Sequence, residues 1–97
     1  MPTFSLTKRA LEDLREIGRY TQERWGRDQR RNYLSQLDRY FHALAENPSQ
    51  GQRCDEIRTG YRKFTSGRHV IFYRSLETGA IEIVRVLHER MDVEIHL

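Results

Sequence analysis

The chain has 97 residues, which is enough for one domain and too few for two, so we expect a single domain over residues 1–97. It is 37% hydrophobic and 32% charged, its net charge is +3, and it lacks an apolar run near the roughly 18 residues of a membrane-spanning helix. No secretory signal is visible, and the single cysteine, Cys54, can form neither an internal disulfide nor a zinc site alone, so we expect a cytoplasmic protein without metal or cofactor.

The N-terminal half predicts a short edge strand and two helices. Residues 2–6 alternate polar and apolar side chains, and Thr7 is a good cap for a following helix. That helix ends at Trp25-Gly26, where Gly26 can take a left-handed conformation, and a second helix runs from near Arg27 to Asn47-Pro48. Because the link between them is so short, we expect an antiparallel helical hairpin.

After a polar connector over residues 49–56, the period of the apolar residues changes to two. Short turns separate three predicted strands, which are Ile57–Phe64, Arg68–Ser75 and Ala80–His88. The tail Glu89–Leu97 is ambiguous between a short strand and a turn. The predicted class is α+β, in the order β-α-α-β-β-β, with the helical hairpin packed on a small antiparallel sheet.

The basic charge of the chain is local. Between Arg58 and Arg74 there are five cations and no acid, whereas the rest of the chain carries 12 cations and 14 anions. Strand alternation puts Arg58 and Arg62 on one face and Tyr61 and Lys63 on the other. The stretch could bind a nucleic-acid backbone or an acidic protein segment, or it could be a solvated face that protects a sheet edge.

Few residues offer catalytic chemistry. Cys54 lies beside Asp55 and Glu56, whose charges would raise the pKa of its thiol and make it a poor nucleophile. His88, at the end of the last predicted strand, could act as a general acid or base, although such a histidine more often makes a surface hydrogen bond. No phosphate-binding glycine loop or metal-ligand spacing is present.

Arg85 interrupts an apolar row that Ile81, Ile83 and Leu87 form on one face of the last predicted strand. A buried arginine is costly unless it is paired. We expect an ion pair with an acid such as Asp13, a cluster of carbonyl acceptors around the guanidinium, or a role for Arg85 as a site residue.

A set of short motifs extends along nearly the whole chain. They are Leu6-Thr7-x-x-Ala10-x-x-Asp13-Leu14-x-x-Ile17, Tyr20-Thr21, Trp25-Gly26, Tyr33, Leu37, Asn47-Pro48, Gly51, Arg58-x-Gly60-Tyr61-Arg62, Gly67–Arg74, and Ile83–His88 followed by Arg90-Met91-Asp92. No single motif is specific, but their order and spacing are. The set resembles the ParE toxins of the RelE/ParE superfamily, which belong to type II toxin–antitoxin modules and share the fold predicted above.

The resemblance implies a bacterial toxin that inhibits DNA gyrase by binding it, rather than an enzyme. It also implies neutralisation by the C-terminal segment of a ParD-like antitoxin, without direct sequence-specific nucleic-acid binding by the toxin. With the charge pattern, it makes the candidate antitoxin-binding residues Arg58, Tyr61, Arg62, Lys63 and Arg68. The candidate gyrase contacts are His88, Arg90, Met91 and Leu97.

An alternative within the same superfamily stays open. RelE-like members are ribosome-dependent mRNA endoribonucleases, and here Arg62, Arg85 and His88 would hold the phosphate and transfer protons. Against this alternative, the tail lacks a tyrosine after His88, and the Tyr61-Arg62 motif matches the ParE branch better. The sequence leaves the oligomeric state open.

Overall fold

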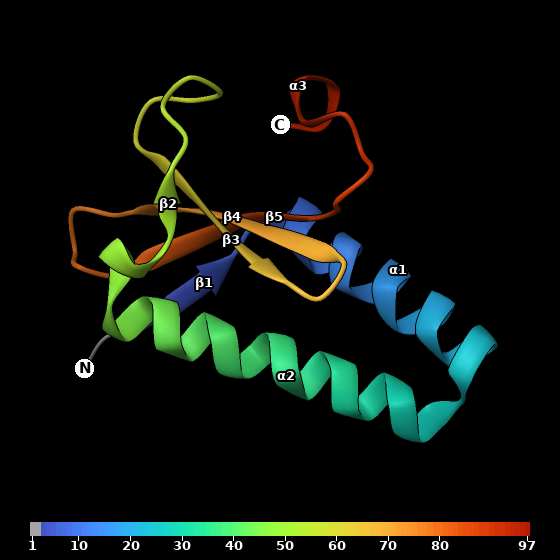
Figure 1. The fold of residues 1–97 in the computed structure, drawn as a ribbon. Coiled ribbons are helices and arrows are strands. Elements are labelled where there is room, and N and C mark those ends of the chain that lie inside the picture. The colour runs from blue at the N-terminus through green and yellow to red at the C-terminus, as the bar shows by residue number, and fades with distance from the viewer. Residues whose placement is uncertain (1–2) are drawn as a thin grey trace.

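The computed structural model describes residues 3–97 and shows two long helices packed against one face of a five-stranded sheet (Figure 1). The strand order is β1-β5-β4-β3-β2. No helix within residues 3–97 is long and apolar enough to cross a membrane. The elements are β1 (Phe4–Leu6), α1 (Lys8–Trp25), α2 (Arg27–Glu46), the 3-10 turn η1 (Pro48–Gln50), β2 (Gln52–Arg53), β3 (Tyr61–Ser66), β4 (His69–Ser75), β5 (Ile81–His88) and α3 (Val93–His96).

The α+β class and the β-α-α-β-β-β order are confirmed, but the sheet is mixed rather than wholly antiparallel. β1 pairs with β5 in parallel, with Phe4 opposite Ile81. Both helices and three strands separate these two strands in the chain, which provides the long crossover that a parallel pair needs. Of the predicted strand over residues 2–6, Pro2 lies outside the described residues.

The predicted helical hairpin is confirmed. The hydroxyl of Thr7 accepts a hydrogen bond from the backbone N–H of Ala10 at 3.0 Å, which caps α1, and it donates to the carbonyl of Val84 in β5 at 2.7 Å. Gly26 alone links α1 to α2, with a positive φ of 92° that favours glycine. The cap therefore fixes the start of α1 to the sheet, and Gly26 reverses the chain.

The predicted three-stranded meander is present, but its first strand begins at Tyr61 rather than at Ile57. The backbone N–H groups of Ile57 and Arg58 both donate to the carbonyl of Cys54, at 2.9 and 3.1 Å, so this segment forms turns instead of a strand. The connector before it supplies the unpredicted two-residue strand β2. The ambiguous tail forms a turn and then the short helix α3.

The predicted face assignment along the last strand is wrong beyond Ile83, because a β-bulge interrupts the pairing of β5 with β4. Phe72 pairs with Arg85, and the next residue of β4, Tyr73, pairs with Ile83, so Val84 has no partner. The extra residue shifts the alternation by one position. Arg85 therefore lies on the opposite face from Ile83 instead of interrupting its row.

The main core lies between the helical hairpin and the sheet. Tyr73, which is fully buried there, donates a hydrogen bond to the carbonyl of Pro48 at 2.6 Å and accepts one from the N–H of Gly51 at 2.9 Å. A Cβ at Gly51 would collide with the Tyr73 ring, so the close approach requires glycine. The buried members of this core are Ala10, Ile17, Leu37, Phe41, Leu44, Ala45, Ile71, Tyr73, Ile81, Ile83 and Val86.

One ion pair joins α1 to the free edge of β5 beyond β1. The two oxygens of Asp13 accept from Nε and Nη2 of Arg85, both at 2.8 Å, and Oδ2 also accepts from the backbone N–H of Val86 at 3.0 Å. Each side chain is only 14% exposed. The predicted pairing of Arg85 with Asp13 is thus confirmed, and the carboxylate satisfies a strand edge that has no neighbouring strand.

Replacing Asp13 by Asn should lower the free energy of unfolding by about 3 kcal/mol, because one partner of a buried ion pair is removed while one acceptor remains. Urea denaturation of the purified protein measures this loss. Asp38→Asn is the control, because Asp38 and its partner His42 have side chains that are 59% and 65% exposed. The control should change stability by less than about 1 kcal/mol. Equal losses in the two variants would contradict this account of the Asp13 pair.

Candidate functional site

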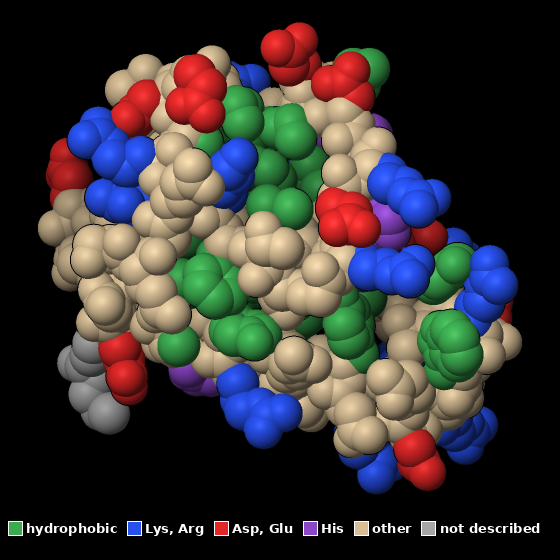
Figure 2. All heavy atoms as spheres, in the orientation of Figure 1, with side chains coloured by type: hydrophobic (Ala, Val, Ile, Leu, Met, Phe, Trp, Pro, Cys, Tyr) green, Lys and Arg blue, Asp and Glu red, His purple; other side chains and the backbone are tan. Residues whose placement is uncertain are grey.

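The face of the sheet opposite the two long helices carries a second, smaller apolar group, which we call the outer apolar cluster. Figure 2 shows hydrophobic side chains gathered between the segment of residues 54–60 and the C-terminal turn. The covering is incomplete, because five members remain half-buried. The cluster consists of buried Cys54, Phe72 and Leu87 with half-buried Ile57, Tyr61, Val70, Val93 and Leu97.

The segment of residues 54–60 is held in place by Asp55. Its Oδ1 accepts from the backbone N–H of Gly60 at 2.8 Å, and its Oδ2 pairs with Arg53 at 2.7 Å. The hydrogen bond from Gly60 and the guanidinium of Arg53 lower the pKa of the Asp55 carboxyl, so it stays charged. Cys54 begins this segment, and burial, followed by the charge of Glu56, raises the pKa of its thiol. The direction is the one predicted from the sequence, but burial rather than the neighbouring acids is the main cause.

Of the predicted antitoxin-binding residues, three lie around the outer apolar cluster. Tyr61 is part of it, Lys63 follows Tyr61 on the same face of β3, and Arg58 lies in the segment beside it. Nε and Nη2 of Arg58 donate to the main-chain oxygen of Leu97, at 3.2 and 2.8 Å. This contact joins the segment to the C-terminal turn across the cluster.

The other two predicted residues lie elsewhere. Arg62 points to the opposite face, where its Nη1 donates to the carbonyl of Gly51 at 2.8 Å, and Arg68 lies in the turn between β3 and β4. The positive charge at the end of the stretch is also offset, because Arg74 pairs with Glu82 of β5 at 2.9 Å. Of the five cations in this stretch, only Arg58 and Lys63 therefore provide positive charge beside the outer apolar cluster without an acidic partner side chain within residues 3–97.

The three residues of the nuclease alternative do not converge. Arg62 is opposite Tyr73 in the sheet and His88 is opposite His69, so they lie four residues apart along β4, roughly 13 Å. Arg85 is engaged by Asp13, and its Nη1 donates to the carbonyl of His96 at 2.7 Å. No group of three histidine, cysteine or acidic side chains that could hold a metal occurs within residues 3–97.

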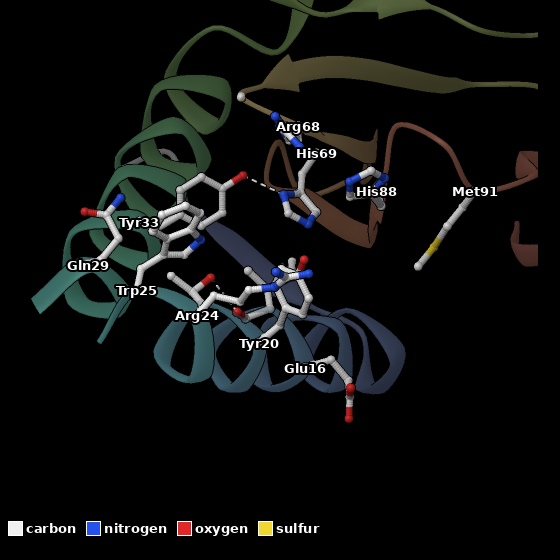
Figure 3. Close-up of a pocket in the computed structure, with 13 residues that line it drawn as sticks. Glu16, Tyr20, Arg24, Trp25, Gln29, Tyr33, Arg68, His69, His88 and Met91 are labelled. Atoms are coloured by element: carbon white, nitrogen blue, oxygen red, sulfur yellow. Dashed lines mark hydrogen bonds between the residues drawn. The ribbon is translucent and has the colours of Figure 1, made fainter. Parts of the chain in front are cut away.

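A groove of about 740 Å³ lies on the helix side of the sheet. It runs between the C-terminal half of α1, the start of α2, the turn between β3 and β4, and the end of β5 (Figure 3). Two of the predicted gyrase contacts, His88 and Met91, line it, whereas Leu97 packs in the outer apolar cluster. The sequence did not predict the groove, which is lined by Glu16, Ile17, Tyr20, Thr21, Arg24, Trp25, Gln29, Tyr33, Gly67, Arg68, His69, His88 and Met91.

Three ring side chains form one wall of this groove (Figure 3). The hydroxyl of Tyr33 lies 2.5 Å from Nδ1 of His69, and the ring of His69 meets the ring of His88 edge-on at 5.5 Å. Burial, and after it the neighbouring His88, lowers the pKa of His69 to about 4. Nδ1 of His88 accepts from the backbone N–H of Arg90 at 3.1 Å.

Comparison with known proteins decides the family. A family model described as "ParE toxin of type II toxin-antitoxin system, parDE" matches residues 4–93. The chain belongs to the ParE toxin family. The resemblance drawn from its motifs is thus confirmed.

Curated members of the ParE family match over nearly their full length. Toxin ParE1 of Mycobacterium tuberculosis is 47% identical over 94 residues, which cover 97% of this chain and 96% of that protein. Toxin ParE1 of Caulobacter vibrioides is 41% identical over 98 residues, which cover 100% of this chain and 99% of that protein. A solved structure titled "Chromosomal ParDE TA system from P. aeruginosa" has the same fold, with a TM-score of 0.76 at 19% identity over 91% of this chain and 96% of that one.

Because the pKa of His69 is low in the folded protein, the free energy of unfolding should decrease as the pH decreases. Between pH 6.5 and 4 the unfolded chain binds a proton at His69 that the folded chain does not, so stability should fall as the pH falls through this window. The loss is at most about 3 kcal/mol, because the partly exposed ring can rehydrate. Urea midpoints at several pH values should show a shallower pH dependence for His69→Gln than for the unmodified protein. The exposed control His42→Gln should keep the original slope, and a His69→Gln slope equal to the control's would refute the assignment.

Proposed function

We propose that this ParE family member inhibits bacterial DNA gyrase by binding it, and that the C-terminal segment of a ParD-like antitoxin neutralises it by covering the outer apolar cluster. The observation that carries the antitoxin part is the cluster itself, an incompletely covered apolar surface with cations at its border. Both long helices pack on the other face of the sheet, so within residues 3–97 no long element closes this one (Figure 1).

The chemistry of this face supports an acidic, amphipathic partner. Half-buried Tyr61 and Val70 offer apolar contact, and Lys63 and the exposed Arg58 offer positive charge beside it. A segment with an apolar stripe and flanking carboxylates would bury the first and pair with the second. Opposite charges also speed the encounter of the two proteins. A disordered antitoxin tail that folds on binding fits such a long, shallow surface.

Binding, rather than catalysis, is supported by where the candidate catalytic groups are. Arg62 donates to Gly51, Arg85 is paired with Asp13, and His88 lies in the groove on the far side of the sheet from the outer apolar cluster. A nuclease needs several such groups around one scissile phosphate. We propose that the protein acts in the bacterial cytoplasm as a gyrase inhibitor, with His88, Arg90 and Met91 as its gyrase contacts. Leu97, the fourth contact predicted from the sequence, is left out of this set because it packs in the outer apolar cluster.

Two reactions with the purified toxin separate gyrase inhibition from the nuclease alternative. In a supercoiling reaction with purified gyrase, we expect supercoiling to be lost and cleaved DNA to accumulate. In a translation reaction, we expect the mRNA to stay intact. Site-specific cleavage of mRNA in the ribosomal A site, with supercoiling unaffected, would overturn the proposal in favour of the RelE-like activity.

Reversing two charges beside the outer apolar cluster should weaken the antitoxin complex. For Arg58→Glu with Lys63→Glu, we expect at least a tenfold rise in the dissociation constant of a ParD-like C-terminal peptide, since about 1.4 kcal/mol corresponds to tenfold. Calorimetry at low and high salt measures the change. The matched control is Arg15→Glu with Arg39→Glu, which makes the same change in net charge on exposed helix positions away from this face. An affinity equal to that of the control at both salt concentrations would show that the antitoxin binds elsewhere.

A further inference from the structure

We infer that the helix-side groove is a second docking surface, which takes an apolar side chain flanked by carboxylates from the toxin's target protein. The inference rests on one part of the proposed function, namely that the toxin acts by binding a target. It adds the groove residues Tyr20, Arg24, Trp25 and Arg68, to which the proposed function gives no role.

The first observation is an unusual gathering of exposed apolar side chains. Tyr20, Trp25 and Met91 are 57%, 71% and 44% exposed, and all three line the groove. They are three of the five large hydrophobic side chains that are exposed within residues 3–97. Burying such side chains against a partner removes apolar surface from water and so stabilises a complex. Tryptophan, tyrosine and methionine are also enriched in protein interfaces.

The second observation explains why Tyr20 and Trp25 are exposed. The helical hairpin extends past the end of the sheet (Figure 1). On α1, Trp25 follows the buried Thr21 by one turn, so the apolar stripe continues beyond the strands that it could cover. Tyr20 and Trp25 also belong to the motifs that carry the family resemblance, yet neither contributes to the core. Contact with a partner accounts for both facts.

The third observation concerns charge at the groove. Arg24 lies over the ring of Tyr20, 5.2 Å from its centroid, and neither Arg24 nor Arg68 forms an ion pair with any residue in the described part of the chain. The single acid of the lining, Glu16, is already taken, because both its oxygens accept from Arg19 at 2.6 Å. Two cations thus remain for the carboxylates of a partner.

A protein fits this groove better than a nucleic acid does. Burial keeps the pKa of His69 well below 7, so its ring adds no positive charge to the groove wall near pH 7. Two arginines beside a wall of ring side chains provide few phosphate contacts, whereas affinity for a nucleic-acid backbone grows with the number of phosphates neutralised.

The position of the groove favours the target over the antitoxin. The outer apolar cluster and the groove lie on opposite faces of the sheet. A short antitoxin segment that binds along one face therefore does not cover both surfaces. Of the proposed gyrase contacts, His88 and Met91 already line the groove. The antitoxin is therefore assigned to the outer face and the target to the helix side.

The test uses the full chain with Tyr20→Ala and Trp25→Ala combined. Both side chains are exposed, so the variant should fold, and its thermal midpoint checks this. We expect growth inhibition in cells and gyrase inhibition in vitro to fall at least tenfold, while the affinity for the ParD-like peptide changes less than twofold. Leu11→Ala is the control, because Leu11 is also on α1 and is 41% exposed but lies outside the groove. The control should keep full toxicity.

Three results would overturn the inference. Unchanged toxicity of the double variant would show that the groove is not the target surface. A loss of peptide affinity would assign the groove to the antitoxin. Binding of a labelled DNA duplex by the unmodified toxin alone, lost in the double variant, would assign it to nucleic acid. The growth assay does not depend on the identity of the target. If the unmodified toxin arrests growth without inhibiting gyrase, gyrase is not the target, and the growth assay of the double variant still shows whether the groove is needed for toxicity.

The charge part of the inference has its own variant. Arg24→Glu should weaken gyrase inhibition in vitro. The difference from the unmodified toxin should become smaller as the salt concentration of the reaction rises, because salt screens the interaction with the partner's carboxylates. Toxicity of Arg24→Glu equal to that of the unmodified toxin would show that the partner carries no carboxylate there.

Discussion

The ion pair between Asp13 and Arg85 ties together three parts of the molecule that the proposed surfaces depend on. It packs α1 along the edge of β5 where β1 has ended, and it satisfies the N–H of Val86 there. Through Nη1, Arg85 also holds the carbonyl of His96, which keeps the C-terminal turn over the outer face. A buried pair adds little net stability, but losing one partner is costly. Its main effect is therefore to fix one arrangement of helix, sheet edge and tail.

From that arrangement two surfaces of different chemistry arise. The outer face has a shallow apolar cluster with cations at its border, between the segment of residues 54–60 and the C-terminal turn. The helix side has a groove with exposed aromatic rings, formed because the hairpin is longer than the sheet beneath it (Figures 1 and 3). In the proposed function the toxin contacts both an antitoxin and a target, and the two faces of one sheet provide room for both.

The helices, the meander and the ion pair could be predicted from the sequence, because periodicity, caps and the cost of a buried arginine are local or pairwise constraints. The bulge at Val84 could not, since it depends on the register between β4 and β5. It moved Arg85 and Leu87 to the outer face, where Leu87 is one of the three buried members of the outer apolar cluster. The groove could not be predicted either, because it depends on how the hairpin is placed against the sheet. One signal was present, since Trp25 lies one turn after buried Thr21 and so extends the apolar stripe of α1 beyond the sheet.

Hydroxyl-radical footprinting of the toxin with each partner tests most directly whether the two faces serve two partners, because it reports the solvent exposure of individual side chains. With the ParD-like antitoxin, we predict that Tyr61 becomes protected while Tyr20, Trp25 and Met91 remain reactive. With gyrase, we predict the reverse. Protection of Trp25 by the antitoxin with Tyr61 left reactive, or protection of the same side chains by both partners, would contradict the account.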